Sequence, residues 1–110
     1  RAGVRVNCVI PGFIGTTGLD RYPESAWPGL RSVGNKAPID RHGTAAEVSA
    51  AVVFLMSEMA AFITGIDFRV DGGIHHGSGG FLFDAGANAG RRSPAFNGFH
   101  RDETAHLLKE

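Results

Sequence analysis

The sequence has little of what marks several classes of protein. Its 110 residues include one cysteine, Cys8, so no internal disulfide can form, which fits a reducing compartment such as the cytoplasm. Eleven basic and eleven acidic side chains cancel, which argues against nucleic acid or an anionic membrane as a partner. No apolar run approaches the roughly 20 residues that span a bilayer, and no secretory signal pattern opens the sequence. We therefore expect a cytoplasmic protein without a nucleic-acid or membrane partner.

The most informative stretch begins at Val4. From there to Ile10 the apolar residues, mostly β-branched, alternate on one face, and Val9 adds to the other face. This pattern predicts a largely buried strand, in which Cys8 is a small core residue. Pro11 cannot donate to a ladder and should end the strand. Gly12 allows either a close approach of two backbones or a positive φ. In open α/β sheets, ligands bind beyond the carboxyl ends of strands, so the loop after Pro11 is a candidate ligand site.

A second strand is expected to follow a long helix. Thr44 and Glu47 have the spacing of a capping box, and the apolar pattern predicts a helix over residues 44–58 that is buried on more than one side, with its methionines in the core. Residues 66–71 alternate as a short strand does, which completes a βαβ unit with parallel strands. Parallel strands are normally buried within a larger sheet. We therefore expect the chain to be part of a larger α/β domain.

The remaining segments are less regular. Pro28 limits regular helix, so we expect a short, irregular helical stretch at 24–34, within a segment 17–35 that is either a mobile lid or an ordinary surface connection. The composition shifts at Ile74 toward glycine-rich sequence. We interpret 74–110 as an extended tail whose phenylalanines anchor it on a surface of this chain or of a neighbouring subunit, with a short helix at 102–109.

Five segments of the sequence stand out in order. They are RVNCVIPGFIGT at 5–16, PIDRHGTAAEV at 38–48, FLMS at 54–57, FITG at 62–65 and VDGG at 70–73. Together they resemble motifs of the short-chain dehydrogenase/reductase family. The resemblance covers residues 1–73, which we predict to be one domain region, distinct from the tail 74–110. More weakly, PAFNGFHR at 94–101 resembles tails of enzymes that act on enoyl-CoA or on terpenoid alcohols of the citronellol type.

The resemblance implies an α/β fold, the C-terminal part of a Rossmann-type doubly wound parallel sheet, with NAD or NADP as cofactor. It implies a small-molecule substrate, an alcohol, carbonyl or enoyl compound, and a homotetramer. The backbone of Ile14 would bond the nicotinamide carboxamide, and Thr16 would also touch the cofactor. The implied cofactor-binding set is Pro11, Gly12, Phe13, Ile14 and Thr16, and the implied lid residues are Leu19, Tyr22 and Trp27.

Two parts of the family pattern do not occur in this sequence. These are the glycine-rich cofactor turn and the catalytic tyrosine with a lysine four positions later, since Tyr22 is the only tyrosine and is followed by Ala26. We therefore assign no catalytic residue and expect the chain alone to be inactive. The alternative is an inert truncated piece that contributes only oligomer-interface surface. The neighbours His75 and His76 should point apart in extended chain, so we expect no metal site there.

Thr16 and Trp27 each keep a second interpretation. Thr16, like Thr17, could cap the helix that follows it, and Trp27 could either wall a substrate pocket or anchor the packing of the lid. The Arg91-Arg92 pair could bind a phosphate of the cofactor or of CoA, or be part of a cationic tail without that role. We interpret Cys8 as a core residue and the histidine pair as solvated.

Overall fold

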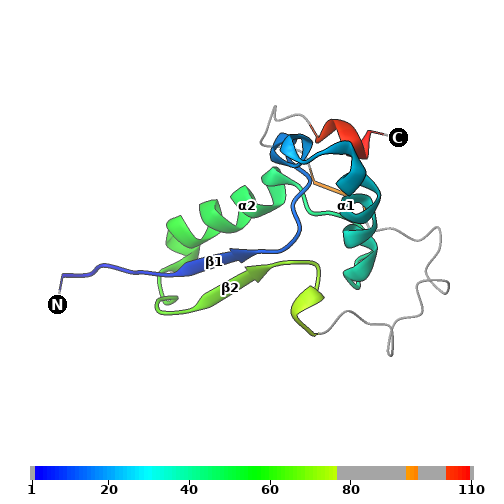
Figure 1. Ribbon diagram of the computed structural model, residues 1–110. Coiled ribbons are helices and arrows are strands. Elements are labelled where there is room, and N and C mark those ends of the chain that lie inside the picture. The colour runs from blue at the N-terminus through cyan, green and yellow to red at the C-terminus, as the bar shows by residue number, and fades with distance from the viewer. Residues whose placement is uncertain (1, 77–93, 97–103, 110) are drawn as a thin grey trace.

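Two parallel strands and one helix make the centre of the structure. The computed structural model describes residues 2–76, 94–96 and 104–109. Strands β1 (Cys8–Pro11) and β2 (Asp67–Val70) pair in parallel, with Cys8 opposite Asp67 and Pro11 opposite Val70. Helix α2 (Ala45–Met56) connects them and runs along one face of the pair (Figure 1). The predicted βαβ unit is confirmed, and with it the α/β fold class.

Helix α2 begins as its sequence predicts. The Thr44 Oγ1 atom accepts the Glu47 N–H at 3.2 Å, and the Glu47 Oε2 atom accepts the Thr44 N–H at 2.9 Å, which is a complete capping box. The helix ends at Met56, and the single 3₁₀ turn η4 (Glu58–Ala60) continues the path beyond it.

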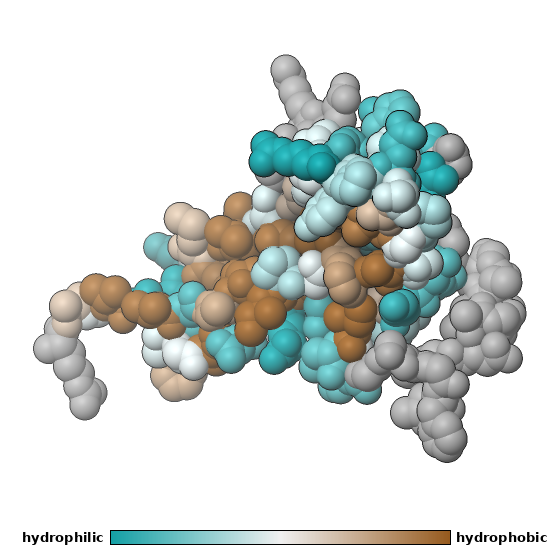
Figure 2. Space-filling model, viewed as in Figure 1, coloured by the Kyte–Doolittle hydropathy of each residue, from teal (hydrophilic) through white to brown (hydrophobic). Residues whose placement is uncertain are grey.

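The helix is exposed along one side, so the prediction that its methionines lie in the core is wrong. Ala46, Ala51 and Leu55 are its buried residues, and the Phe54 ring lies 6.3 Å from that of Phe68 on β2. By contrast, Val53, Met56 and Met59 are 57%, 78% and 77% exposed, so the methionines do not fill a core. A layer of two strands is too narrow to cover a helix all round. Figure 2 shows hydrophobic side chains gathered over the strand pair and α2.

The first strand is shorter and more exposed than predicted. Val4 and Val6 are 74% and 70% exposed, and Cys8 is exposed rather than part of the core. The described residues before Cys8 form no strand ladder, and individual hydrogen bonds connect them to residues 64 and 65. The Val6 N–H donates to the Thr64 Oγ1 atom at 3.1 Å, and the Gly65 N–H donates to the Val6 carbonyl at 2.7 Å. Because α2 covers one face of the pair, side chains on the other face meet solvent.

Short helical turns separate β1 from α2. They are η1 (Thr17–Arg21), η2 (Glu24–Ala26), α1 (Trp27–Val33) and η3 (Gly34–Lys36). Pro28 lies in the first turn of α1, where its missing N–H costs no hydrogen bond. The predicted short, irregular helical stretch is confirmed. Neither η1, η2 nor α1 contains a buried residue.

The described parts of the tail fold back onto this chain. The turn η5 (Ile74–His76) follows β2, and the predicted terminal helix is a single turn, η6 (His106–Leu108), beside the segment 17–35 (Figure 1). Phe96 is 44% exposed, while Phe81, Phe83, Phe99 and the Arg91-Arg92 pair lie outside the described residues. The division at residue 73 stays a prediction. Within the described ranges, no helix is long and apolar enough to cross a membrane.

Candidate functional site

The loop that leaves β1 passes very close to the end of β2. The Gly12 N–H donates to the Val70 carbonyl at 3.0 Å, which adds one bond beyond Pro11. A Cβ atom on Gly12 would lie 2.7 Å from the Asp71 Cα atom and 2.8 Å from its Cβ atom. Gly12 does not have a positive φ. A glycine is therefore needed here for the close approach of two backbones, and not for a left-handed conformation.

Ile14 presents an unused backbone donor. Gly43 pairs with the loop on both sides of Ile14: its N–H donates to the Phe13 carbonyl and its carbonyl accepts the Gly15 N–H, each at 2.9 Å. This pairing directs the Ile14 peptide groups away from Gly43. The Ile14 carbonyl accepts the Thr16 N–H at 3.0 Å, whereas the Ile14 N–H has no acceptor in the described part of the chain. Ile14 is half-buried and lines the cavity described below, and the N–H and carbonyl of one such residue can together bind a ligand amide.

The Thr16 hydroxyl is also available. Thr16 occupies the N-cap position of η1 but makes no side-chain capping bond, so capping does not account for this residue. Its position two residues after Ile14 places a hydroxyl and an unused amide on the same short loop.

The three predicted lid residues lie on η1, on α1 and between them. Leu19 is half-buried and Tyr22 is 54% exposed. The Trp27 Nε1–H donates to the Tyr22 carbonyl at 3.1 Å, and the Trp27 ring lies 6.4 Å from the His106 ring. Through these contacts Trp27 acts as a packing anchor of the segment 17–35.

A cavity of about 320 Å³ lies between the loop, the segment before α2 and the end of β2. Phe13 and Ile14 line it, whereas Leu19, Tyr22 and Trp27 are not among its described lining residues. Its polar side chains are those of Arg41, Glu47, Arg69 and Asp71. Sequence reasoning did not select these four as site residues. The sequence feature that could have identified three of them is the family motifs, since Arg41 and Glu47 lie in the segment 38–48 and Asp71 lies in the segment 70–73.

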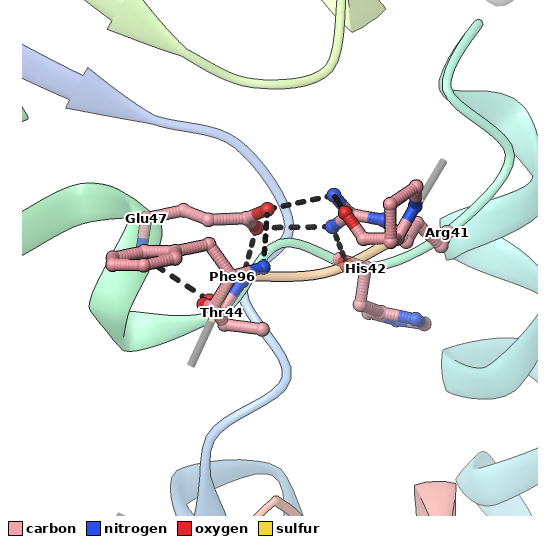
Figure 3. Close-up of polar contacts among 6 residues, drawn as sticks. Arg41, His42, Thr44, Glu47 and Phe96 are labelled. Atoms are coloured by element: carbon pink, nitrogen blue, oxygen red, sulfur yellow. Dashed lines mark hydrogen bonds and ion pairs between the residues drawn. The ribbon is translucent and has the colours of Figure 1, made fainter. Parts of the chain in front are cut away.

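One carboxylate holds the wall of this cavity together. Glu47 accepts from Arg41 Nη1 at 3.0 Å and Nη2 at 2.6 Å, and from the Phe96 N–H at 3.3 Å, besides its capping bond to Thr44 (Figure 3). Burial raises the pKa of Glu47, but the hydrogen bond from Arg41 and those from the backbone outweigh it, so that the pKa is below its ordinary value. The network bonds His42 and Thr44, which flank Gly43, and Gly43 pairs with the loop at Ile14.

The neighbouring His42 ties this wall to α1. Its Nε2 atom lies 3.0 Å from the Leu30 carbonyl, and a Cβ atom on Gly34 would lie only 2.5 Å from its Nδ1 atom. Burial lowers the pKa of His42. The Nε2 atom is the donor of the bond to Leu30, because a carbonyl can only accept.

The turn after β2 is ordered by Asp71. Its Oδ1 atom accepts the Gly73 N–H at 2.9 Å, and its Oδ2 atom lies 2.7 Å from His75 Nδ1. The rings of His75 and His76 are 3.8 Å apart. The prediction that these side chains point apart is therefore wrong, because the segment is a 3₁₀ turn and not extended chain. The described residues contain no group of three or more metal-ligating side chains that could hold an ion.

Asp71 should make stability depend on pH in the acid range. Burial raises its pKa, but the hydrogen bonds from Gly73 and His75 outweigh it and leave the pKa below the ordinary 3.8. The carboxylate's contribution is thus complete above the unfolded pKa and is lost as pH falls through the lower folded one. We would measure the free energy of unfolding by urea titration at pH values from about 6 to about 3. Over this range, the Asp71→Asn variant should lose less stability than the unaltered chain. Parallel curves for the two chains would contradict this assignment.

The chain is similar to known proteins over about two thirds of its length. A family model described as enoyl-(acyl carrier protein) reductase matches residues 1–75. The chain is 44% identical over 79 residues to 2-(S)-hydroxypropyl-CoM dehydrogenase 3 of Xanthobacter autotrophicus, covering 66% of this chain and 29% of that protein. It is 35% identical over 71 residues to the 3-oxoacyl-(acyl-carrier-protein) reductase FabG of Thermotoga maritima, covering 64% and 28%.

A solved structure agrees with the sequence matches. The crystal structure of YwfH, described as an NADPH-dependent reductase involved in bacilysin biosynthesis, matches with a TM-score of 0.57 and 35% identity, over 64% of this chain and 30% of that one. The chain thus spans less than a third of the length of these relatives. Since the family model matches more than half of the chain and the parallel strand pair has the expected order, the chain belongs to the short-chain dehydrogenase/reductase family.

Proposed function

We propose that this chain is the C-terminal part of an NAD(P)-dependent oxidoreductase and supplies its nicotinamide-side loop and substrate lid. The observation that carries the proposal is the unpartnered N–H of Ile14, beside its own carbonyl, on a loop at the carboxyl end of β1. NAD or NADP is the cofactor that goes with this family. When bound, its reduced form would give a hydride to a carbonyl or enoyl compound, and its oxidised form would take one from an alcohol.

The residues present fit such a cofactor. A carboxamide offers one acceptor oxygen and two N–H donors, which match the Ile14 N–H and carbonyl. Thr16 adds a hydroxyl that makes no capping bond. Pro11 ends β1, and the Gly12 N–H bonds the start of the loop to the Val70 carbonyl at the end of β2. Phe13, which is 50% exposed, gives the loop an apolar side chain.

The segment 17–35 would close over a small-molecule substrate, an alcohol, a carbonyl compound or an enoyl compound. Leu19, Tyr22 and Trp27 supply apolar surface for it. The proton donor of the reaction is not among the residues of this sequence, because the family's tyrosine and lysine pair has no counterpart here. We therefore propose that the chain by itself lacks activity. We further propose that the complete protein is a cytoplasmic homo-oligomer.

A hybrid enzyme tests the proposal directly. Residues 1–73 replace the matching segment of the Thermotoga maritima reductase, which is long enough to supply the rest of the domain. We expect the hybrid to bind NADH or NADPH and to reduce a 3-oxoacyl thioester. Thr16→Ala in the hybrid should raise the cofactor Kd about tenfold, the equivalent of about 1.4 kcal/mol.

The matched control is Thr17→Ala, which removes the adjacent, exposed hydroxyl and should leave the Kd unchanged. A folded hybrid that binds neither cofactor would refute the proposal. Equal effects of the two substitutions would refute the role of Thr16.

A second candidate function is favoured by the exposed apolar side chains of α2 and the turns around it. Val53, Met56, Met59 and Phe62 are at least half exposed, and Phe62 is entirely so. Such a surface fits an inert piece that contributes only an oligomer interface. A folded but inactive hybrid, together with self-association of the chain in sedimentation, would favour this function over the first.

A further inference from the structure

The end of the described chain is among its most deeply buried parts. Ala105 and Leu107 are both 0% exposed, and Leu107 is the large side chain that is fully buried in the described residues. Both belong to residues 104–109, which contain the turn η6. A terminal segment buried in this way is held by specific contacts, since termini otherwise fray.

One anchor comes from η1. The carboxylate of Asp20 accepts the His106 N–H at 2.9 Å and the Leu107 N–H at 3.2 Å. Both donors are in the first turn of η6 and have no partner within it. The hydrogen bond from His106 is the main cause of the lowered pKa of Asp20, so the group accepts these bonds as a carboxylate.

A second anchor comes from α1. The Arg31 Nε–H donates to the Leu107 carbonyl at 2.6 Å, and the Trp27 ring is tilted against the His106 ring. Leu107 is thus bonded at its N–H by η1 and at its carbonyl by α1. These two elements have no buried residue of their own, and a seven-residue helix is not stable in isolation.

The same segment also touches the loop after β1. Thr104 pairs with Thr16 in an antiparallel bridge, and the Ala105 N–H points to the Gly15 carbonyl at 3.5 Å. A Cβ atom on Gly15 would lie 2.6 Å from Leu108 Cδ1. Residues 104–109 therefore contact the loop on one side and the segment 17–35 on the other.

We infer that residues 104–109 are a clasp that orders the segment 17–35 against the loop after β1. The segment moves away from the loop only when the clasp detaches, so access to the loop is coupled to the C-terminus of the chain. This inference is independent of the proposed function, because it concerns order within the chain and is measured without a cofactor.

Hydrogen exchange followed by mass spectrometry tests the clasp. Asp20→Ala removes both acceptors of η6, and Leu107→Ala removes the buried anchor. Each should speed exchange over residues 17–35 about tenfold and leave the exchange of α2 unchanged. The matched control is Asp67→Ala, an exposed aspartate on β2, which should change neither region.

Trp27 provides a second readout, because it is the only tryptophan of the chain. Leu107→Ala should shift its emission to longer wavelength and increase quenching by acrylamide. Unchanged exchange over 17–35 in both variants, an equal rise in α2, or no protection of this segment in the unaltered chain would each overturn the inference.

Discussion

Gly12→Ala is expected to destabilise the chain by about 3 kcal/mol, the upper part of the range for overpacking. The new Cβ atom would lie 2.7 Å from the Asp71 Cα atom and 3.1 Å from the Asp71 carbonyl oxygen. These are backbone atoms at the end of β2, so no side-chain rotation can relieve the clash. The strands would have to separate where the Gly12 N–H bonds the Val70 carbonyl. Urea denaturation followed by circular dichroism measures the loss.

The matched control is Gly29→Ala. Gly29 lies in α1, has no positive φ, and a Cβ atom there would meet nothing within 4 Å. Alanine is the better helix former, so this change should stabilise the chain by about 0.5–1 kcal/mol. Equal effects at the two glycines would contradict the close approach of the loop to β2.

Glu47→Ala is expected to destabilise the chain by about 2–3 kcal/mol. It removes the acceptor for the Thr44 N–H, for the Phe96 N–H and for both terminal nitrogens of Arg41. The Arg41 side chain is only 14% exposed, so its charge would be left poorly hydrated. Because this network bonds the two neighbours of Gly43, which pairs with the loop, the substitution should also weaken cofactor binding in the hybrid enzyme.

Glu58→Ala is the control for Glu47→Ala. Glu58 is exposed, begins η4 and makes no ion pair within the described residues, so its removal should change the free energy of unfolding by less than about 0.5 kcal/mol. A loss at Glu58 comparable to that at Glu47 would show that general helix charge, and not the network, is responsible.

The sequence by itself determined the local elements and the family. The Thr44 and Glu47 pair predicted the start of α2 because a capping box involves only residues three apart. Pro11 predicted the end of β1, and Pro28 the irregularity before α2, because proline acts on its own backbone. The order of the motif segments, which led to the family, is likewise a property of the chain alone.

Tertiary structure decided which side chains are buried and which groups meet. The exposure of Cys8, Met56 and Met59 depends on how many layers cover a surface, and periodicity does not report that number. The reason for Gly12 was decided by the position of Asp71, which lies 59 residues later.

The contacts of the C-terminal segment show the same division. The burial of Leu107 beneath Asp20 and Arg31 joins groups more than 70 residues apart. No local pattern specifies such pairs. They form because the parallel strand pair and the fold-back of the tail bring distant backbone groups to hydrogen-bonding distance, where each buried donor requires an acceptor.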